Sequence, residues 1–240
     1  MGSGQQGAAR SEPRVWQSGY LLLRSLGSHL RAQARLRFEA RDPIDVLDLG
    51  CGTRPYERIF RPYAKSYVGV DVQAAPNVDV VANAQSLPFE DGSFDCVICT
   101  QLLEHADDPR AVTAEIFRVL RPDGIAFVST HGVAPYHASP AAAVDDYWRW
   151  THAGLERLLL TTGSWREVLI LPNGATASAL SYLVGRELEI VAGKLGMRIA
   201  AAPAVLLANA AAWSLDRILR GLYPSRPPDL APNYLAVAVR

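Results

Sequence analysis

The sequence predicts one α/β domain built on a mostly parallel sheet of seven strands. The apolar run Asp45–Leu49 leads directly into two closely spaced glycines and then Pro55, a residue that suits the first turn of a helix. Apolar runs and helical patterns then alternate along the chain, as they do in parallel sheets with right-handed crossovers. The chain has 240 residues, of which 49% are hydrophobic and 20% charged, so it can bury a full core.

Seven short apolar runs, bounded by glycine, proline or aspartate, are the expected strands. They cover Asp45–Leu49, Tyr67–Val70, Asp79–Val81, Asp95–Cys99, Ile125–Ser129, Arg166–Leu171 and Tyr234–Val239. The helices between them are expected at Pro55–Phe60, from Asp108 to just before Pro122, and from a capping Thr151 to Thr162. These elements define an expected core at residues 41–174, which a last strand at residues 233–240 completes.

The N-terminal region divides into two parts. Residues 1–12 are small and polar and are expected to form a flexible N-terminus. In residues 13–40 the apolar side chains recur at helical spacing, namely Trp16, Tyr20, Leu23, Leu26 and Leu30. We expect a helix packed on the core, with Gly27 as the point at which it would divide.

Residues 175–232 form an unusual insertion before the last strand. Two apolar, helix-like stretches, Ala175–Leu195 and Met197–Leu222, predict a helical hairpin. The uncharged run within the second stretch is shorter than the ~20 residues that span a bilayer, and it contains Pro203 and Asn209. The hairpin is expected to cover the ligand site, to form a homodimer or to touch a membrane surface, and the first two alternatives are favoured.

The turn after the first strand predicts a site for a nucleotide-like cofactor. Gly50 and Gly52 let the backbone turn tightly and lie against a ligand, and Asp48 can orient the loop through its carboxylate. Asp71, at the end of the second strand, can accept hydrogen bonds from ribose hydroxyls. The dinucleotide fingerprint needs a third glycine, whose place is taken here by Pro55.

Three later segments, read together with this turn, resemble the class I S-adenosylmethionine (SAM)-dependent methyltransferases that act on small molecules. They are Ala82–Asp95, Leu102–His105 and Val119–Gly124. A fourth, Asp145–Thr151, is similar to a His-Asp-Tyr-aromatic-Arg-aromatic-Thr motif of one subgroup, with Asp145 in place of the histidine. The resemblance implies a Rossmann-like class I methyltransferase fold with an antiparallel last strand, SAM as cofactor and S-adenosylhomocysteine as product. It also implies that residues 13–40 form a lid over the cofactor.

The resemblance further implies which residues hold the cofactor. They are Asp48, Gly50, Cys51, Gly52, Asp71, Val72, Asn83, Ala84, Thr100 and Gln101. The glycine-loop backbone suits the methionine carboxylate and amino group, whereas Thr100 and Gln101 should lie under the methionine portion. Asn83 stands where the family has an aspartate, and its amide oxygen can accept a hydrogen bond from the adenine amine without charge assistance.

Two histidines are candidate catalytic residues. His131 lies just beyond the fifth strand, where an imidazole can accept the proton of a hydroxyl or amine, although it can equally be a loop histidine in water. His105 is a candidate base or a structural residue beside the cofactor. Tyr147, Trp148 and Arg149 are the candidate substrate-binding residues. Arg149 can bind an anionic group in bidentate fashion, or it can pair with an acid and dock the next helix.

The expected reaction is methyl transfer to an oxygen of a small metabolite, with nitrogen as the second choice. The acceptor class includes natural products, sugars and lipid-linked intermediates. Two alternatives remain open: an enzyme that uses SAM without methyl transfer, for cyclisation or rearrangement, and a non-catalytic SAM-binding module.

Composition limits the partners and the compartment. Lys+Arg and Asp+Glu are equal at 24 each, so bulk charge does not indicate nucleic acid. The three cysteines, without a signal peptide, indicate the cytoplasm. Cys96 and Cys99 have the C-x-x-C spacing of metal sites, but in a strand an offset of three places the two sulfurs on opposite faces. No metal site is therefore expected.

Overall fold

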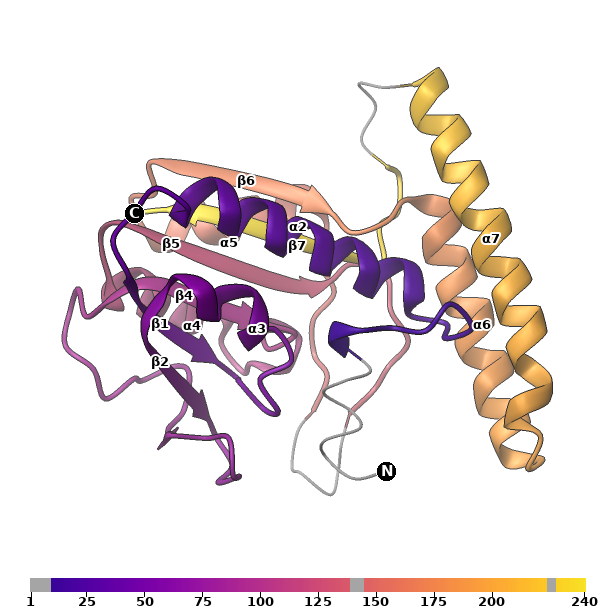
Figure 1. Cartoon of the computed structure of the whole chain (residues 1–240), viewed down its shortest axis with the longest axis horizontal. Helices are drawn as coiled ribbons and strands as arrows, with labels where there is room; N and C mark the ends of the chain where they lie inside the picture. The colour runs from indigo at the N-terminus through magenta and orange to yellow at the C-terminus, as the bar shows by residue number, and fades with distance from the viewer. Residues whose placement is uncertain (1–9, 139–144, 224–227) are drawn as a thin grey trace.

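The structure, a computed structural model, describes residues 10–138, 145–223 and 228–240 (Figure 1). Most of the expected flexible N-terminus, up to residue 9, lies outside the described residues. Seven strands form one sheet in the order β3-β2-β1-β4-β5-β7-β6. They are β1 (Ile44–Leu49), β2 (Ala64–Asp71), β3 (Val80–Val81), β4 (Phe94–Thr100), β5 (Leu120–His131), β6 (Glu167–Pro172) and β7 (Asn233–Val239). β7 runs antiparallel to both of its neighbours, β5 and β6, whereas the other strand pairs among the described residues are parallel. The predicted fold class is confirmed.

Among the elements that the structure describes, six α-helices and two short 3-10 helices connect and cover the strands. The α-helices are α2 (Tyr20–Phe38), α3 (Glu57–Phe60), α4 (Pro109–Val119), α5 (His152–Thr162), α6 (Thr176–Lys194) and α7 (Arg198–Leu222), and the 3-10 helices are η1 (Arg61–Tyr63) and η2 (Leu103–His105). The predicted caps of α4 and α5 are confirmed, because Asp108 accepts from the Arg110 N–H and Thr151 from the Gly154 N–H.

Three boundaries differ from the prediction. The N-terminal helix begins at Tyr20 rather than near residue 13, and Gly27 is buried inside an unbroken α2. The helix expected at Pro55–Phe60 begins at Glu57, and η1, which contains Pro62, follows it directly. β5 already begins at Leu120, because the predicted Pro-Asp-Gly turn forms a bulge inside the strand: Leu120 pairs with Phe94, whereas Ile125 pairs with Cys96.

Two buried clusters fill the space on the two faces of the sheet. The cluster under α4 and α5 contains Leu49, Cys99 and Val128, and the cluster under α2 and α3 contains Cys96 and Phe127. Cys96 and Cys99 thus lie on opposite faces, as their spacing predicts, and each is a free, buried thiol. The core side of α2 is buried along its length, so this helix is part of the packed domain (Figure 1).

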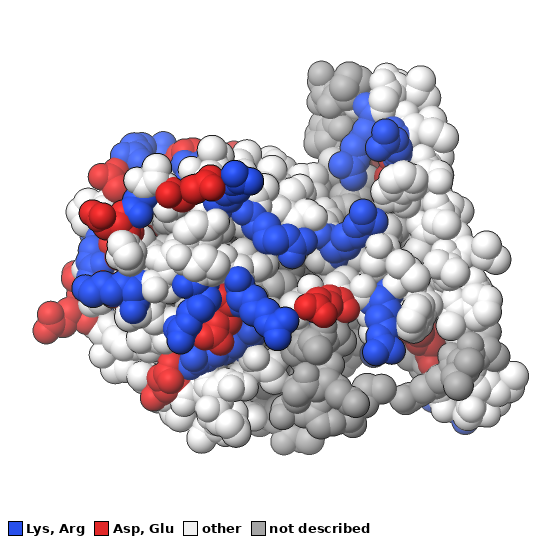
Figure 2. Space-filling model, in the orientation of Figure 1, with Lys and Arg blue, Asp and Glu red and all other residues white. Residues whose placement is uncertain are grey.

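Helices α6 and α7 form the predicted hairpin, which stands at one end of the molecule (Figure 1). The buried carboxylate of Asp216 on α7 accepts hydrogen bonds from the N–H groups of Ala177 and Ser178 at the start of α6. Asn209 donates to the carbonyl oxygens of Val15 and Gln17, which fixes the hairpin to the segment before α2. The face of the hairpin that points away from α2 is exposed, and Figure 2 shows few charges over it.

No helix among the described residues is both long and apolar enough to cross a membrane.

Candidate active site

The loop after β1 is shaped by hydrogen bonds to β2. The N–H groups of Gly50 and Cys51 both donate to the Val70 carbonyl oxygen, at 2.9 and 3.0 Å. The Gly52 N–H donates to a carboxylate oxygen of Asp71 at 3.0 Å. Gly50 has φ +69°, and a Cβ there would lie 2.5 Å from the Leu102 Cδ1 atom. Only glycine therefore gives the loop this path, because a side chain would be strained and would collide with Leu102.

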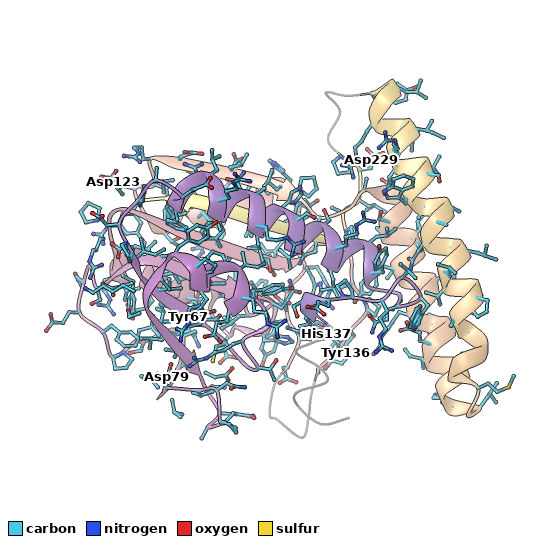
Figure 3. All side chains as sticks on the ribbon, viewed as in Figure 1. Tyr67, Asp79, Asp123, Tyr136, His137 and Asp229 are labelled. Carbon is cyan, nitrogen blue, oxygen red and sulfur yellow. The ribbon has the colours of Figure 1, made fainter. Side chains whose placement is uncertain are left out.

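Asp48 occupies a different position from the one expected. Its side chain is only 4% exposed, and its Oδ2 atom accepts a hydrogen bond of 2.7 Å from the Tyr67 hydroxyl, which Figure 3 labels. Burial raises the pKa of Asp48 to about 6. The expectation that this carboxylate orients the glycine loop directly is corrected, since the Asp71 carboxylate is the one that bonds to the loop.

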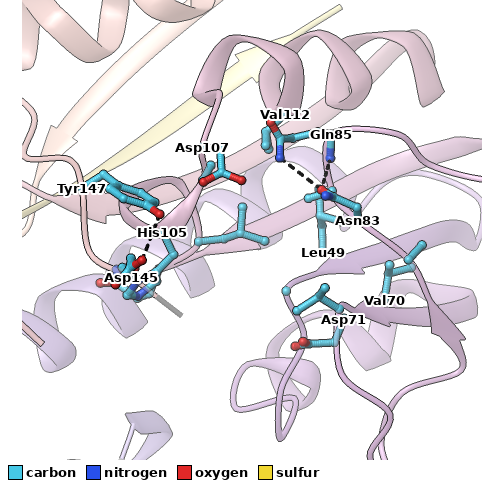
Figure 4. A pocket seen from close by; sticks show the side chains of 17 residues that line it. Leu49, Val70, Asp71, Asn83, Gln85, His105, Asp107, Val112, Asp145 and Tyr147 are labelled. Carbon is cyan, nitrogen blue, oxygen red and sulfur yellow. Dashed lines mark hydrogen bonds between the residues drawn. The ribbon is translucent and has the colours of Figure 1, made fainter. Parts of the chain in front are cut away.

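A cavity of about 330 Å³ opens beside the loop, at the carboxyl ends of β1, β2 and β4 (Figure 4). Its walls combine small apolar side chains with polar groups at the rim. The lining residues that the sequence singled out are Gly50, Asp71, Val72, Asn83, Ala84, Gln101, His105 and Tyr147. Ligands of parallel α/β sheets bind at this edge.

Other candidate residues lie outside the lining of this cavity. They are Asp48, Cys51, Gly52, Thr100, His131, Trp148 and Arg149. Cys51 and Thr100 are buried beneath the loop and the end of β4. The structure also adds lining residues that the sequence did not single out as site residues, among them Gln85, Leu102, Asp107, Val112 and Asp145. Leu102 and Gln85 follow the carboxyl ends of β4 and β3 within two and four residues, which is the signal that could have identified them.

Two amide side chains at the cavity have distinct roles. The Asn83 Oδ1 atom accepts from the Gln85 N–H at 2.9 Å, so this amide forms a local turn as well as facing the cavity (Figure 4). Gln101 has φ +56°, and its Nε2 donates to the Ser129 hydroxyl at 3.0 Å. The Gln101 Oε1 atom is buried and accepts no hydrogen bond from the residues that the structure describes.

The polar end of the cavity is formed by residues after β4 and by the Asp145–Thr151 segment. The His105 Nδ1 atom lies 2.5 Å from the Asp145 carbonyl oxygen, and the Tyr147 hydroxyl donates to the Asp145 carboxylate at 3.1 Å (Figure 4). The bond to the carbonyl fixes the proton of His105 on Nδ1 and leaves a lone pair on Nε2.

His131 lies deeper, behind this end of the cavity. It is 8% exposed, and its Nε2 is 3.4 Å from the Oε1 atom of the fully buried Glu104. Burial lowers the pKa of His131 to about 3, so the ring is neutral. The interpretation of His131 as a loop histidine in water is therefore wrong, and the cavity is lined by His105 instead.

Arg149 and Trp148 are engaged within the protein. The two terminal nitrogens of Arg149 bond to both carboxylate oxygens of the buried Asp146, at 2.5 and 2.6 Å. The Trp148 Nε1 donates to the Ala106 carbonyl oxygen at 2.8 Å. Arg149 was expected either to bind an anionic group or to pair with an acid, and the structure shows the pairing with an acid. Asp146 already bonds to the two guanidinium nitrogens that a bidentate anion would need.

A SAM molecule fits the groups that this cavity offers. The glycine loop brings its backbone to the cavity wall at Gly50, and the Gln101 Oε1, which has no partner among the described residues, suits an ammonium group. Asp71, with a carboxylate oxygen at the rim, suits ribose hydroxyls. The fold and the cavity define the class of protein: a SAM-dependent methyltransferase with a Rossmann-like fold.

Comparison with known proteins identifies the family. A family model described as a methyltransferase domain matches residues 24–167, more than half of the chain, so the chain belongs to this family. A probable SAM-dependent methyltransferase of Mycolicibacterium smegmatis is 29% identical over 211 residues, which cover 82% of this chain and 81% of the relative. The cofactor is SAM and the protein is an enzyme.

Solved structures show the same fold. The cyclase SpnF superimposes with a TM-score of 0.55 at 22% identity, covering 89% of this chain and 80% of that one. The 1,6-didemethyltoxoflavin-N1-methyltransferase of Burkholderia thailandensis, solved with 1,6-didemethyltoxoflavin and S-adenosylhomocysteine, has a TM-score of 0.50 at 20% identity and covers 62% of this chain and 72% of that one.

Replacing Asp48 by asparagine should stabilise the protein at neutral pH. The folded-state pKa of about 6 lies above the unfolded value of 3.8, so the wild type loses stability as the pH rises from about 4 through 6. The asparagine side chain keeps an acceptor for Tyr67 and does not ionise. The free energy of unfolding of Asp48→Asn, relative to wild type, should therefore rise by about 2–3 kcal/mol between pH 4 and pH 8. Urea titrations across this range measure the difference.

Asp45→Asn is the matched control, because Asp45 lies on the same strand with a pKa that the Ser66 hydroxyl and Arg121 lower. Because that pKa lies below the unfolded value of 3.8, its difference from wild type should stay nearly constant between pH 4 and pH 8 and change, in the opposite direction, only at lower pH. A difference for Asp48→Asn that is independent of pH would contradict the account of Asp48.

Proposed function

We propose that the protein transfers the methyl group of SAM to an oxygen, or in second place a nitrogen, of a small metabolite. The observation that carries this proposal is that one cavity joins the glycine loop and Asp71 to a polar end formed by His105, Asp107, Asp145 and Tyr147. Such groups bind and orient hydroxyl or amine acceptors. Natural products, sugars and lipid-linked intermediates all carry these acceptors.

The proposed cofactor contacts follow the cavity from the loop outward. The backbone at Gly50 and the amide of Gln101 would hold the methionine portion, and Asp71 would accept from the ribose. Val72 and Ala84 would lie against the adenine, with Asn83 at its edge. Cys51, Gly52 and Thr100 would act from behind by shaping the loop and the end of β4, and Asp48 would tie β1 to Tyr67 on β2.

The bound cofactor supplies a methyl group on a positively charged sulfur, which an acceptor attacks in line. The protein's part is mainly to position the acceptor and to exclude water. Tyr147 and Asp145 would orient it by hydrogen bonds. His105 would accept its proton at Nε2, since the hydrogen bond to the Asp145 carbonyl keeps the existing proton on Nδ1. Trp148, Arg149 and His131 would support these groups without facing the cavity.

Incubation with methyl-labelled SAM and a metabolite extract tests the reaction. Methyl transfer predicts label in a small-molecule product and formation of S-adenosylhomocysteine. Conversion of a metabolite without incorporated label would instead favour use of the cofactor in a cyclisation, the reaction class named for SpnF. Binding of SAM with neither label nor conversion, across extracts from several sources, would favour a binding module.

Asp71→Ala should weaken cofactor binding. The variant removes the proposed ribose acceptor and also the bond that anchors the Gly52 N–H. The loss of a charge-assisted hydrogen bond costs roughly 1.5–3 kcal/mol, which corresponds to an affinity about tenfold or more lower. Calorimetric titration with S-adenosylhomocysteine measures it. Asp91→Ala removes an exposed carboxylate remote from the cavity and should leave the affinity unchanged; equal affinity in both variants would reject the role of Asp71.

We further propose that the exposed face of the α6–α7 hairpin packs against a second copy of the chain. Large apolar side chains lie on this face, among them Leu180, Val184, Leu195, Leu207 and Leu222. Several large exposed apolar side chains on one pair of helices normally mark an interaction site. Contact with a membrane surface is the less favoured alternative, and neither partner is needed to complete the cavity, whose described lining contains no residue of α6 or α7.

Leu207→Glu should convert a dimer into a monomer. Leu207 is 70% exposed, so a glutamate there is accommodated in the isolated chain but would be desolvated in an interface. Light scattering gives the mass, and titration with S-adenosylhomocysteine should show unchanged affinity. Leu160→Glu on α5, also at an exposed leucine, is the control and should remain dimeric. A wild-type protein that is monomeric at all concentrations would contradict the proposal.

A further inference from the structure

Three side chains with metal-ligating atoms meet behind the polar end of the cavity. Glu104 comes from η2, His131 from the end of β5, and His137 from the loop that follows, where Figure 3 labels it. Each offers one ligand atom, and these atoms all lie within 4.8 Å of one another. Glu104 is far from the two histidines in the sequence, and the spacing of His131 and His137 matches no metal-binding motif.

One carboxylate oxygen of Glu104 has no hydrogen-bond partner in the part of the chain that the structure describes. The residue is 0% exposed, and its Oε2 accepts from the Thr130 hydroxyl at 2.8 Å. Its Oε1 is buried and accepts no hydrogen bond from any residue in the described ranges. A carboxylate that is buried without a partner is costly, so a protein that keeps one there needs a proton or a cation to neutralise it.

The spacing between Glu104 and His131 suits two ligands of one metal ion. The Oε1–Nε2 distance of 3.4 Å is longer than a normal hydrogen bond. Two ligands at about 2.0–2.1 Å from a tetrahedral ion lie roughly 3.3 Å apart.

His137 is held as metal-binding histidines usually are. Its Nδ1 lies 3.1 Å from the Oδ2 atom of Asp146, which also accepts from the His137 backbone N–H at 2.9 Å. Arg149 in turn holds Asp146 through both carboxylate oxygens. A carboxylate on Nδ1 fixes the tautomer and leaves the Nε2 lone pair for an ion. The Asp146–Arg149 pair thereby acquires a positioning role.

We propose that Glu104, His131 and His137 bind one divalent transition-metal ion of the Zn²⁺ type. Two imidazoles and a carboxylate suit Zn²⁺ and its neighbours better than Mg²⁺ or Ca²⁺. Three protein ligands leave a coordination position open. The ring centroid of His105, which lines the cavity, lies 4.9 Å from that of His137, so the proposed ion site lies close to the cavity. Binding of the metal ion is independent of the proposed function. The further step, in which an oxygen of the acceptor occupies the open position, rests on the proposed methyl transfer.

Calorimetric titration of Zn²⁺ into untagged, chelator-treated protein tests the site. The wild type should bind one equivalent, and Mg²⁺ should bind much more weakly. Loss of an outer-shell partner typically costs about 10–100-fold in affinity, so Glu104→Gln and His137→Ala, which remove ligands, should each cost at least that. His152→Ala removes an exposed histidine outside the cluster and should bind like the wild type.

Two results would overturn the inference: a wild type that binds no Zn²⁺, or a tight site that both Glu104→Gln and His137→Ala retain. Circular dichroism and titration with S-adenosylhomocysteine check that the variants fold. If the variant at the buried Glu104 does not fold, the Zn²⁺ affinity of His137→Ala, whose side chain is partly exposed, decides whether the site exists. The titration needs no acceptor. Zn²⁺ binding without methyl transfer would therefore reject only the proposed function. Methyl transfer without Zn²⁺ binding would reject only the proposed metal site.

Discussion

The hydrogen bonds between the glycine loop and the end of β2 determine the shape of the site. The N–H groups of Gly50 and Cys51 share the Val70 carbonyl oxygen, and the Gly52 N–H bonds to the Asp71 carboxylate. These bonds hold the loop against β2 in a left-handed conformation that places Gly50 beside Leu102. The cavity lies beside this loop and is lined by residues at or after the carboxyl ends of β1, β2 and β4.

The opposite end of the site depends on buried charge. Glu104 and Asp146 are acids in the interior, and the protein neutralises them differently. Asp146 has a bidentate partner in Arg149, whereas one oxygen of Glu104 has, among the described residues, no hydrogen-bond partner and a histidine nitrogen at 3.4 Å. The Asp146–Arg149 pair is therefore a structural ion pair in the wall of the site. Glu104, by contrast, still needs a positive partner.

Local patterns in the sequence were enough to predict the fold and half of the site. Strand ends followed by glycine, aspartate or amide residues indicate the carboxyl edge of a parallel sheet, so Gly50, Asp71, Asn83 and Gln101 were found and do line the cavity. The pairing of Arg149 with Asp146 and the environment of His131 could not be settled, because both depend on which loops the sheet order brings together. Asp48 was misassigned for the same reason: its partner, Tyr67, lies on the neighbouring strand.

The most direct test of the account is a crystal structure of the protein with S-adenosylhomocysteine. The account predicts the adenosine between Val72 and Ala84, its ribose on Asp71, and the sulfur directed toward His105 and Tyr147. A ligand bound elsewhere, or one whose sulfur points away from the polar end of the cavity, would contradict it.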